Sequence, residues 1–183
     1  MNPLDIIRTY YQAGTLAYEV LVRHSEAVAA AALEAARRVP HLSPDYEFIE
    51  EAAMLHDIGI CYTDVPKIGC FGSFAYICHG YLGRELLEKH GLPDHGRVCE
   101  RHVGAGLYAS DIIRQGLPLP VRDMVPETVE EQIICFADSF FSKTPPPEGT
   151  RRSVESVIAS LERHGRDKAE RFFRWLDVFG SAA

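Results

Sequence analysis

Apolar residues recur at helical spacing along almost the whole chain. Leu4, Ile7 and Tyr11 fall on one face of a first short helix. The next stretch, from about residue 15 to 38, is rich in alanine and has no internal glycine or proline. Pro40 would end it, because proline cannot continue a helix. This pattern predicts a short helix followed by a long one.

Further helices are predicted between breaks in the apolar pattern. Ser43-Pro44 is typical of a helix N-cap and first turn, and Gly59 is placed to end that helix after His56-Asp57. Later helices are expected over 76–90, from Asp94 to about 102, and over 107–115, 127–142, 151–163 and 166–178. The intervening segments 60–75, 116–126 and PPPEG at 145–149 are expected to be loops.

The few β-branched runs lie inside helical patterns, so the fold class expected is all-α. We predict a helical bundle of about seven to nine helices in one domain that spans residues 1–183. A chain of 183 residues with 46% hydrophobic content suits one such core.

Composition narrows the cellular context. The formal net charge is -7 and no basic stripe is present, so no nucleic acid polymer is expected as a partner. No apolar run is long enough to cross a membrane and the N-terminus lacks the pattern of a signal peptide, so we expect no membrane and a cytoplasmic protein. The five cysteines form no CxxC pair, which favours reduced thiols over a cysteine zinc site.

Polar residues stand within several apolar helical faces. Asp138 lies inside the run IICFADSFF, and His56-Asp57 ends an equally apolar helix. His24, His79 and His102 also share faces with aliphatic residues. Each alone is more often a hydrogen-bonded core group than a ligand. The other histidines, at helix ends or turns, are expected to be exposed: His41, His90, His95 and His164.

Taken together, the six polar residues predict a metal centre, because a bundle brings inward faces together. Six imidazole and carboxylate ligands suit two divalent ions, with Asp57 as the bridging carboxylate. This ligand mixture favours iron or manganese, with zinc, nickel or magnesium as alternatives.

The order His24, His56-Asp57, Asp138 resembles the H…HD…D signature of the HD superfamily, and HDIG at 56–59 matches a common form of its central motif. The resemblance covers a core of about residues 20–142, and we expect the C-terminal helices 151–178 to pack on this core. His79 and His102, between the HD pair and the last Asp, resemble the two-metal members. The spacing is similar to that of bacterial HD hydrolases that split diadenosine tetraphosphate. It implies one ion on His24, His56, Asp57 and Asp138 and a second on Asp57, His79 and His102.

This resemblance implies a metal-dependent phosphohydrolase. Its expected partner is a small phosphorylated substrate, such as a nucleotide, whose phosphoester or phosphoanhydride is attacked by a metal-bridging hydroxide. Expected catalytic residues are Asp57 and, in the loop after it, Asp64 and Lys67. Arg84, Arg101 and Lys143 are candidates for binding the substrate phosphates, each with an ordinary surface charge as its alternative.

Two other functions share these ligands and stay open at this stage. One is an HD-type di-iron oxygenase acting on a phosphonate-like substrate, and the other is a non-catalytic signalling HD module. The C-terminal stripe FFRWLDVF at 172–179 is also open, since it suits either a homodimer face or a core face.

Overall fold

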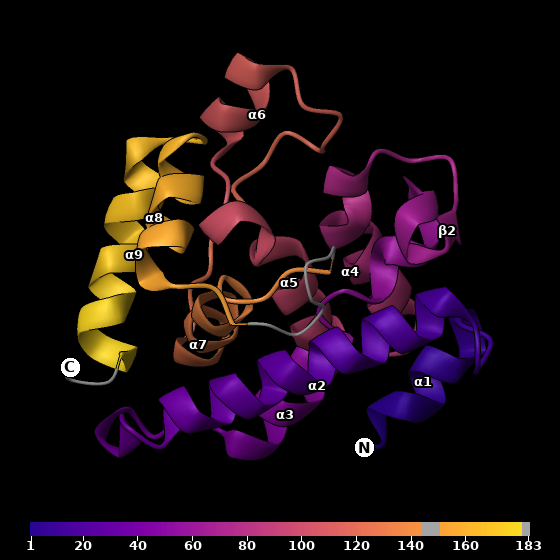
Figure 1. Ribbon diagram of the computed structural model, residues 1–183, viewed down its shortest axis with the longest axis horizontal. Coiled ribbons are helices and arrows are strands. Elements are labelled where there is room, and N and C mark those ends of the chain that lie inside the picture. The colour runs from indigo at the N-terminus through magenta and orange to yellow at the C-terminus, as the bar shows by residue number, and fades with distance from the viewer. Residues whose placement is uncertain (144–150, 181–183) are drawn as a thin grey trace.

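The structure of the protein is a computed structural model, which describes residues 1–143 and 151–180. The expected break PPPEG at 145–149 lies outside the described residues. Within them, the chain forms nine α-helices and one two-stranded sheet (Figure 1), which confirms the all-α expectation. The α-helices are α1 (Pro3–Tyr10), α2 (Leu16–Ala36), α3 (Tyr46–Leu55), α4 (His79–Lys89), α5 (Pro93–Arg101), α6 (Ala109–Gln115), α7 (Val129–Asp138), α8 (Val154–Glu162) and α9 (Arg166–Phe179).

Side chains that cap the backbone fix where several helices begin. The Thr15 side chain accepts a hydrogen bond from the Tyr18 backbone at the start of α2. Thr128 and Glu131 form a reciprocal capping box at the start of α7. None of the helices in the described ranges is long and apolar enough to span a membrane.

The predicted cap at Ser43 is wrong. A 3₁₀ turn, η1 (Pro40–Leu42), places Ser43 in a left-handed conformation with φ of 52°. The cap is Asp45, whose Oδ1 accepts from the Phe48 backbone at 3.0 Å, so α3 begins two residues later than expected. The short 3₁₀ turn leaves no signal in the apolar spacing, which explains the error.

The segment predicted as a loop after the HD pair contains short regular pieces. It holds the 3₁₀ turns η2 (Ile58–Tyr62) and η3 (Pro66–Ile68) and an antiparallel pair, β1 (Asp64–Val65) and β2 (Cys70–Phe71). Strands of two residues are too short to show alternation in the sequence. The hairpin lies beside the start of α2, at the far end of the molecule from α9 (Figure 1).

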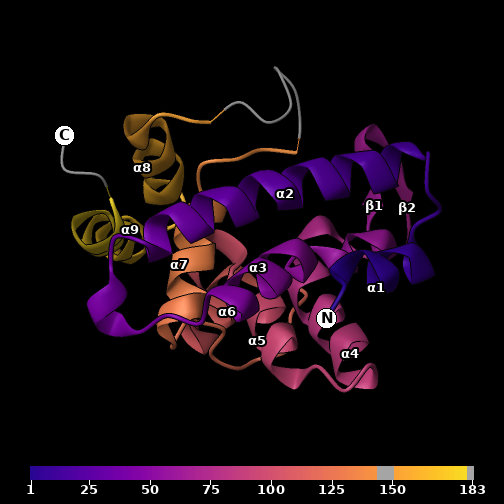
Figure 2. The same cartoon turned by 90° about the horizontal axis from the view of Figure 1, so that it is seen from below.

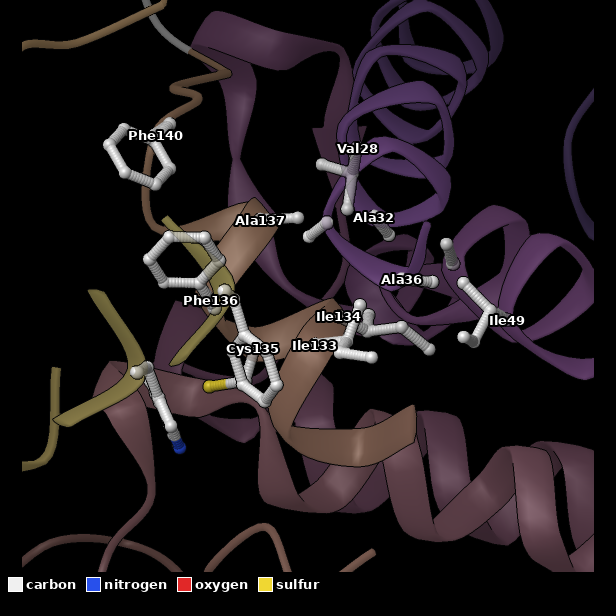
Figure 3. Packing of buried hydrophobic residues seen from close by; sticks show 14 of the residues in the cluster. Val28, Ala32, Ala36, Ile49, Ile133, Ile134, Cys135, Phe136, Ala137 and Phe140 are labelled. Carbon is white, nitrogen blue, oxygen red and sulfur yellow. The ribbon is translucent and has the colours of Figure 1, made fainter. Parts of the chain in front are cut away.

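The main core lies where α2, α3 and α7 meet (Figure 3). Small residues of α2, Ala32 and Ala36, are fully buried against Ile49 and Ile134. From α9, Phe172 stacks on Phe136 with ring centroids 5.4 Å apart. The long helix α2 runs beside α3, and the chain after its C-terminal end meets α9 (Figure 2), where Arg38 donates to the carbonyl of Phe179. The bundle therefore brings the middle of α2 close to the end of α7.

The C-terminal stripe is divided between core and surface. Phe172, Trp175 and Phe179 are buried in the main core, whereas Phe173 and Val178 are exposed. One face of α9 is therefore a core face, because its aromatic side chains close the bundle beside α7.

Candidate metal centre

Six polar side chains from five helices converge in the interior of the bundle. His24 lies in the middle of α2, His56 and Asp57 directly follow α3, and His79 is the first residue of α4. His102 follows α5, and Asp138 is the last residue of α7. All are buried except Asp138, whose side chain is 18% exposed. The centre is therefore enclosed on most sides and reaches solvent beside Asp138.

Asp57 lies between two sets of donors. Its Oδ2 is 3.1 Å from Nε2 of His24 and 3.0 Å from Nε2 of His56. Its Oδ1 is 3.2 Å from Nε2 of His79 and 3.5 Å from Nε2 of His102. Asp138 completes the first set with an oxygen 3.0 Å from His24. Each set is compact enough to hold a metal ion, with its potential ligand atoms within 4.8 Å of one another.

Backbone hydrogen bonds orient three of the imidazoles. Nδ1 of His56, His79 and His102 lies 2.6, 2.6 and 2.7 Å from the carbonyl oxygen of the residue three positions earlier. A carbonyl can only accept, so each Nδ1 carries a proton and Nε2 is the ring atom that faces the other donors of the centre. Such outer hydrogen bonds are typical of metal-ligating histidines.

Without a cation, this arrangement would bring lone pairs together. Nε2 of His24 is 3.3 Å from Nε2 of His56, and Nε2 of His79 is 3.1 Å from Nε2 of His102. Oδ1 of Asp57 is buried without a hydrogen-bond partner in the described part of the chain. Buried lone pairs and carboxylates need a proton or a metal between them. The donor set and its unpaired oxygens thus fit divalent ions.

The pKa values show how strongly the pocket favours positive charge. Burial opposes a charged His56, but the neighbouring carboxylates of Asp57 and Asp138 raise its pKa to about 10. Burial also opposes the two carboxylates, yet His56 and Lys143 hold the pKa of Asp57 well below its usual range, and His24 and His56 do the same for Asp138. Burial lowers the pKa of His102. The centre therefore holds two carboxylates ionised in the interior.

Lys143 also reaches the centre. Its Nζ is 2.5 Å from Oδ2 of Asp57 and 5.9 Å from the ring centroid of Tyr76. Tyr76 in turn stacks on His79 with centroids 4.6 Å apart. Burial opposes the charge on Lys143, but Asp57 raises its pKa above the ordinary value. The ammonium group lies against the carboxylate that faces both donor sets.

The other expected site residues lie away from this cluster. Arg84 pairs with Glu88 and Glu100, and Arg101 pairs with Glu127 and Glu131. Lys67 and Asp64 are exposed on the β1–β2 hairpin. The two arginines are committed to structural ion pairs and the hairpin presents its charges to solvent, so the structure brings none of these four into the centre.

His95 corrects a further expectation. It was expected at an exposed helix end, but only 8% of it is exposed. The helix α5 starts at Pro93, so His95 lies in its first turn, packs edge-on against Phe48 and faces Glu51.

A cleft of about 200 Å³ opens beside the centre, and sequence reasoning missed most of its wall. His102 and Asp138 line one side, while Arg152, Ser160 and His164 line the other. These last residues follow the 144–150 segment, where no motif marks them. The one sequence signal is the Arg151-Arg152 pair, which is too short to indicate a basic patch.

Comparison with known proteins gives a family match and several relatives, which include the following three. The family described as HD domain matches residues 21–142. A tRNA (cytidine(56)-2'-O)-methyltransferase of Picrophilus torridus is 36% identical over 68% of this chain and 32% of that protein. The protein of the same name from Thermoplasma volcanium is 30% identical over 85% of this chain and 40% of its own length. An uncharacterized protein of Methanocaldococcus jannaschii is 32% identical over 81% of this chain and 79% of its own length. No solved structure matches the chain.

These names contradict two expectations from the sequence. Two relatives are named as RNA methyltransferases and none of the three as a phosphohydrolase, so the expected phosphohydrolase activity on a small phosphorylated substrate is wrong. They support neither the oxygenase nor the signalling alternative. The expectation of no nucleic acid partner is wrong for the same reason, since both named proteins modify tRNA. The phosphohydrolase expectation failed because metal-ligating residues indicate that an ion binds but do not determine the substrate. The net charge misled because it is a sum over the whole surface and does not describe any one face.

Proposed function

Because the chain belongs to the HD domain family, we propose that it is a metal-binding domain of the tRNA-modification machinery, which binds two divalent ions and contacts tRNA beside them. One observation carries the metal part: two sets of buried histidine and aspartate side chains share Asp57. The tRNA part rests on the two relatives named as tRNA methyltransferases.

The proposed first ion is held by His24, His56, Asp57 and Asp138. The second would be held by Asp57, His79 and His102, so Asp57 would be shared by the two ions. Iron and manganese suit this mixture of imidazole and carboxylate ligands. Bound divalent ions would supply positive charge that neutralises an RNA phosphate.

The chain's own residues support such contact in two ways. Lys143 adds a cation beside Asp57 and Tyr76, on the described chain just after α7. The partial exposure of Asp138 leaves the first set open to the cleft. A phosphate would therefore meet the ions and Lys143 from the cleft side.

We assign metal binding and tRNA contact to this chain, and not methyl transfer. The chain spans 32% and 40% of the lengths of the two methyltransferases, less than half of either. We also propose that residues 1–183 act as one HD domain, since α9 packs into the same core as α2 and α7.

The test combines metal analysis with tRNA binding. The purified chain is loaded with Mn²⁺, or with Fe²⁺ under anaerobic conditions, and its metal content is measured by mass spectrometry. Binding of an unmodified tRNA transcript is then measured by fluorescence anisotropy before and after chelation with EDTA. We expect about two ions per chain and tRNA binding at least about tenfold tighter when the ions are present.

Two variants make the test specific. Asp57→Asn removes the shared ligand and should abolish both the metal content and the metal-dependent part of tRNA binding. His95→Gln, which changes a buried histidine outside both sets, should alter neither. Equal tRNA affinity with and without bound metal would refute the proposed function.

A further inference from the structure

The cleft beside the metal centre has a basic wall that no function described so far uses. We propose that this cleft binds a backbone phosphate of tRNA, with Arg152 as its main cation and Ser160 and His164 as further contacts. The inference rests on the proposed function and names the part of the RNA that the site would take.

Arg152 is held in place beside a proposed metal ligand. Its backbone N–H donates to the carbonyl of Phe140 at 2.8 Å, which ties the start of the C-terminal segment to the end of α7. Its guanidinium donates to the carbonyl oxygens of Ser156 at 2.8 Å and Ser139 at 3.5 Å. Ser139 directly follows Asp138, so the cation is fixed next to the first donor set.

The charge of Arg152 has no carboxylate partner among the described residues. Its acceptors there are neutral carbonyl and hydroxyl oxygens. By contrast, Arg84 and Arg122 both pair with Glu100, and Arg101 pairs with Glu131. A guanidinium has five donors in a planar fork that matches phosphate oxygens. Arg152 thus keeps both charge and donors for an anion.

Charge is distributed unevenly along the sequence. Residues 151–183 contain seven lysines and arginines against five acidic residues, whereas residues 1–150 contain twelve against twenty-one. The basic segment forms α8 and α9, and α8 supplies the cleft wall (Figure 1). Because Lys168 and Arg171 are buried, the surface charges of this segment nearly balance, whereas the acidic excess that gives the net charge of -7 lies before residue 151.

The size of the cleft limits what it can accept. A volume of about 200 Å³ is below the range of about 300–1,000 Å³ that is usual for pockets that enclose small organic ligands. Among the described residues that line the cleft, Asp138 alone carries a carboxylate, and in the proposed centre its charge would be taken up by a metal ion. These features favour the binding of one phosphate group and part of the adjoining ribose. The remaining nucleotides of the RNA would lie outside the cleft.

The experiment compares two arginines of the C-terminal segment. Arg152→Gln removes the cleft cation, and Arg166→Gln removes a cation whose side chain is 92% exposed and which pairs with Glu170 outside the cleft. Binding of a labelled tRNA transcript to the Mn²⁺-loaded chain is measured across salt concentrations. We expect Arg152→Gln to weaken binding about tenfold and to reduce the salt slope by about one, and Arg166→Gln to change affinity less than about twofold.

Two further measurements separate the possible outcomes. His164→Asn tests the wall without disturbing the contacts of Arg152, and should weaken tRNA binding about threefold by loss of a polar contact. Inorganic phosphate is used as a competitor, and it should displace tRNA from the wild type more readily than from Arg152→Gln. Metal content and thermal unfolding are measured for each variant.

Equal tRNA affinity of the Arg152→Gln and Arg166→Gln variants would overturn the inference. So would loss of metal in Arg152→Gln, because Arg152 would then act only through Asp138. Competition by phosphate with no effect of Arg152→Gln on tRNA binding would limit the cleft to free anions and also overturn it. If the wild type binds tRNA equally well after EDTA, the proposed function fails before this inference is reached.

Discussion

Replacing His79 should remove one metal ion and leave the other. His79 belongs only to the second donor set, so His79→Ala leaves two ligands, Asp57 and His102, for that ion, while the first set keeps all four of its own. The metal content should fall from about two ions per chain to about one. With free metal about a hundredfold above each dissociation constant, each bound ion stabilises the fold by about 2.7 kcal/mol. The variant should therefore lose roughly 5–11 °C of the metal-induced rise in melting temperature.

The assay is mass spectrometry of metal content after dialysis against Mn²⁺ at about a hundredfold above each dissociation constant, together with thermal unfolding of each protein with and without metal. Because each variant is compared with its own metal-free form, loss of the hydrogen bond to the Tyr76 carbonyl cancels. His95→Ala is the matched control, since it removes a buried histidine outside both donor sets. Two ions retained by His79→Ala, or one lost by His95→Ala, would refute the shared-carboxylate arrangement.

Three other changes test the fold and the centre. Asp111→Asn should destabilise the protein by about 3 kcal/mol at pH 7 in urea unfolding, because it removes a partner of the fully buried Lys168. Burial opposes ionisation of Asp111, but Lys168 lowers the pKa of its carboxyl group. The stabilisation should therefore be present above about pH 4, the ordinary range of an aspartate, and should be lost as the pH falls below it. Equal loss of stability in acid by the variant and the wild type would contradict this. Gly59→Ala should lower the free energy of unfolding by more than about 3 kcal/mol, since its Cβ would lie 2.1 Å from the carbonyl oxygen of His79. Gly83→Ala should lower it less, because its Cβ would lie 3.3 Å from the Sγ of Cys99. Equal losses of stability in chemical denaturation would count against the close approach at Gly59. EDTA should lower the melting temperature of the wild type and leave that of Asp57→Asn unchanged in a thermal shift assay, and an equal fall in both would argue against Asp57 as the shared ligand.

Much of the fold follows from apolar spacing. The long helix predicted over 15–38 is α2 (Leu16–Ala36), and the two C-terminal helices lie within a few residues of their predicted ranges. Errors fall where short-range geometry decides the backbone. Ser43 and Asp45 are both good capping residues, and only the 3₁₀ turn before them determines which one caps α3.

The metal cluster was accessible from sequence because its members are polar residues on apolar helical faces. Nothing local shows that His102 and His79 meet, but the bundle brings their Nε2 atoms to 3.1 Å. The cations were harder to place. Arg84 and Arg101 look like phosphate ligands in the sequence, yet glutamates distant in the chain neutralise them. Arg152 belongs to no sequence motif. Whether it can bind an anion depends on which acidic residues lie near it in the fold, and the sequence does not show that.

Three of the helices that supply the cluster, α3, α5 and α7, run toward it and stop there, so each presents the negative end of its dipole. Only α4 begins there and presents the opposite end. These helix ends add their negative potential to the charge of the two carboxylates, so the centre favours bound cations. The direction of these helices therefore favours a sequence of binding in which the ions enter the centre before an RNA phosphate approaches it.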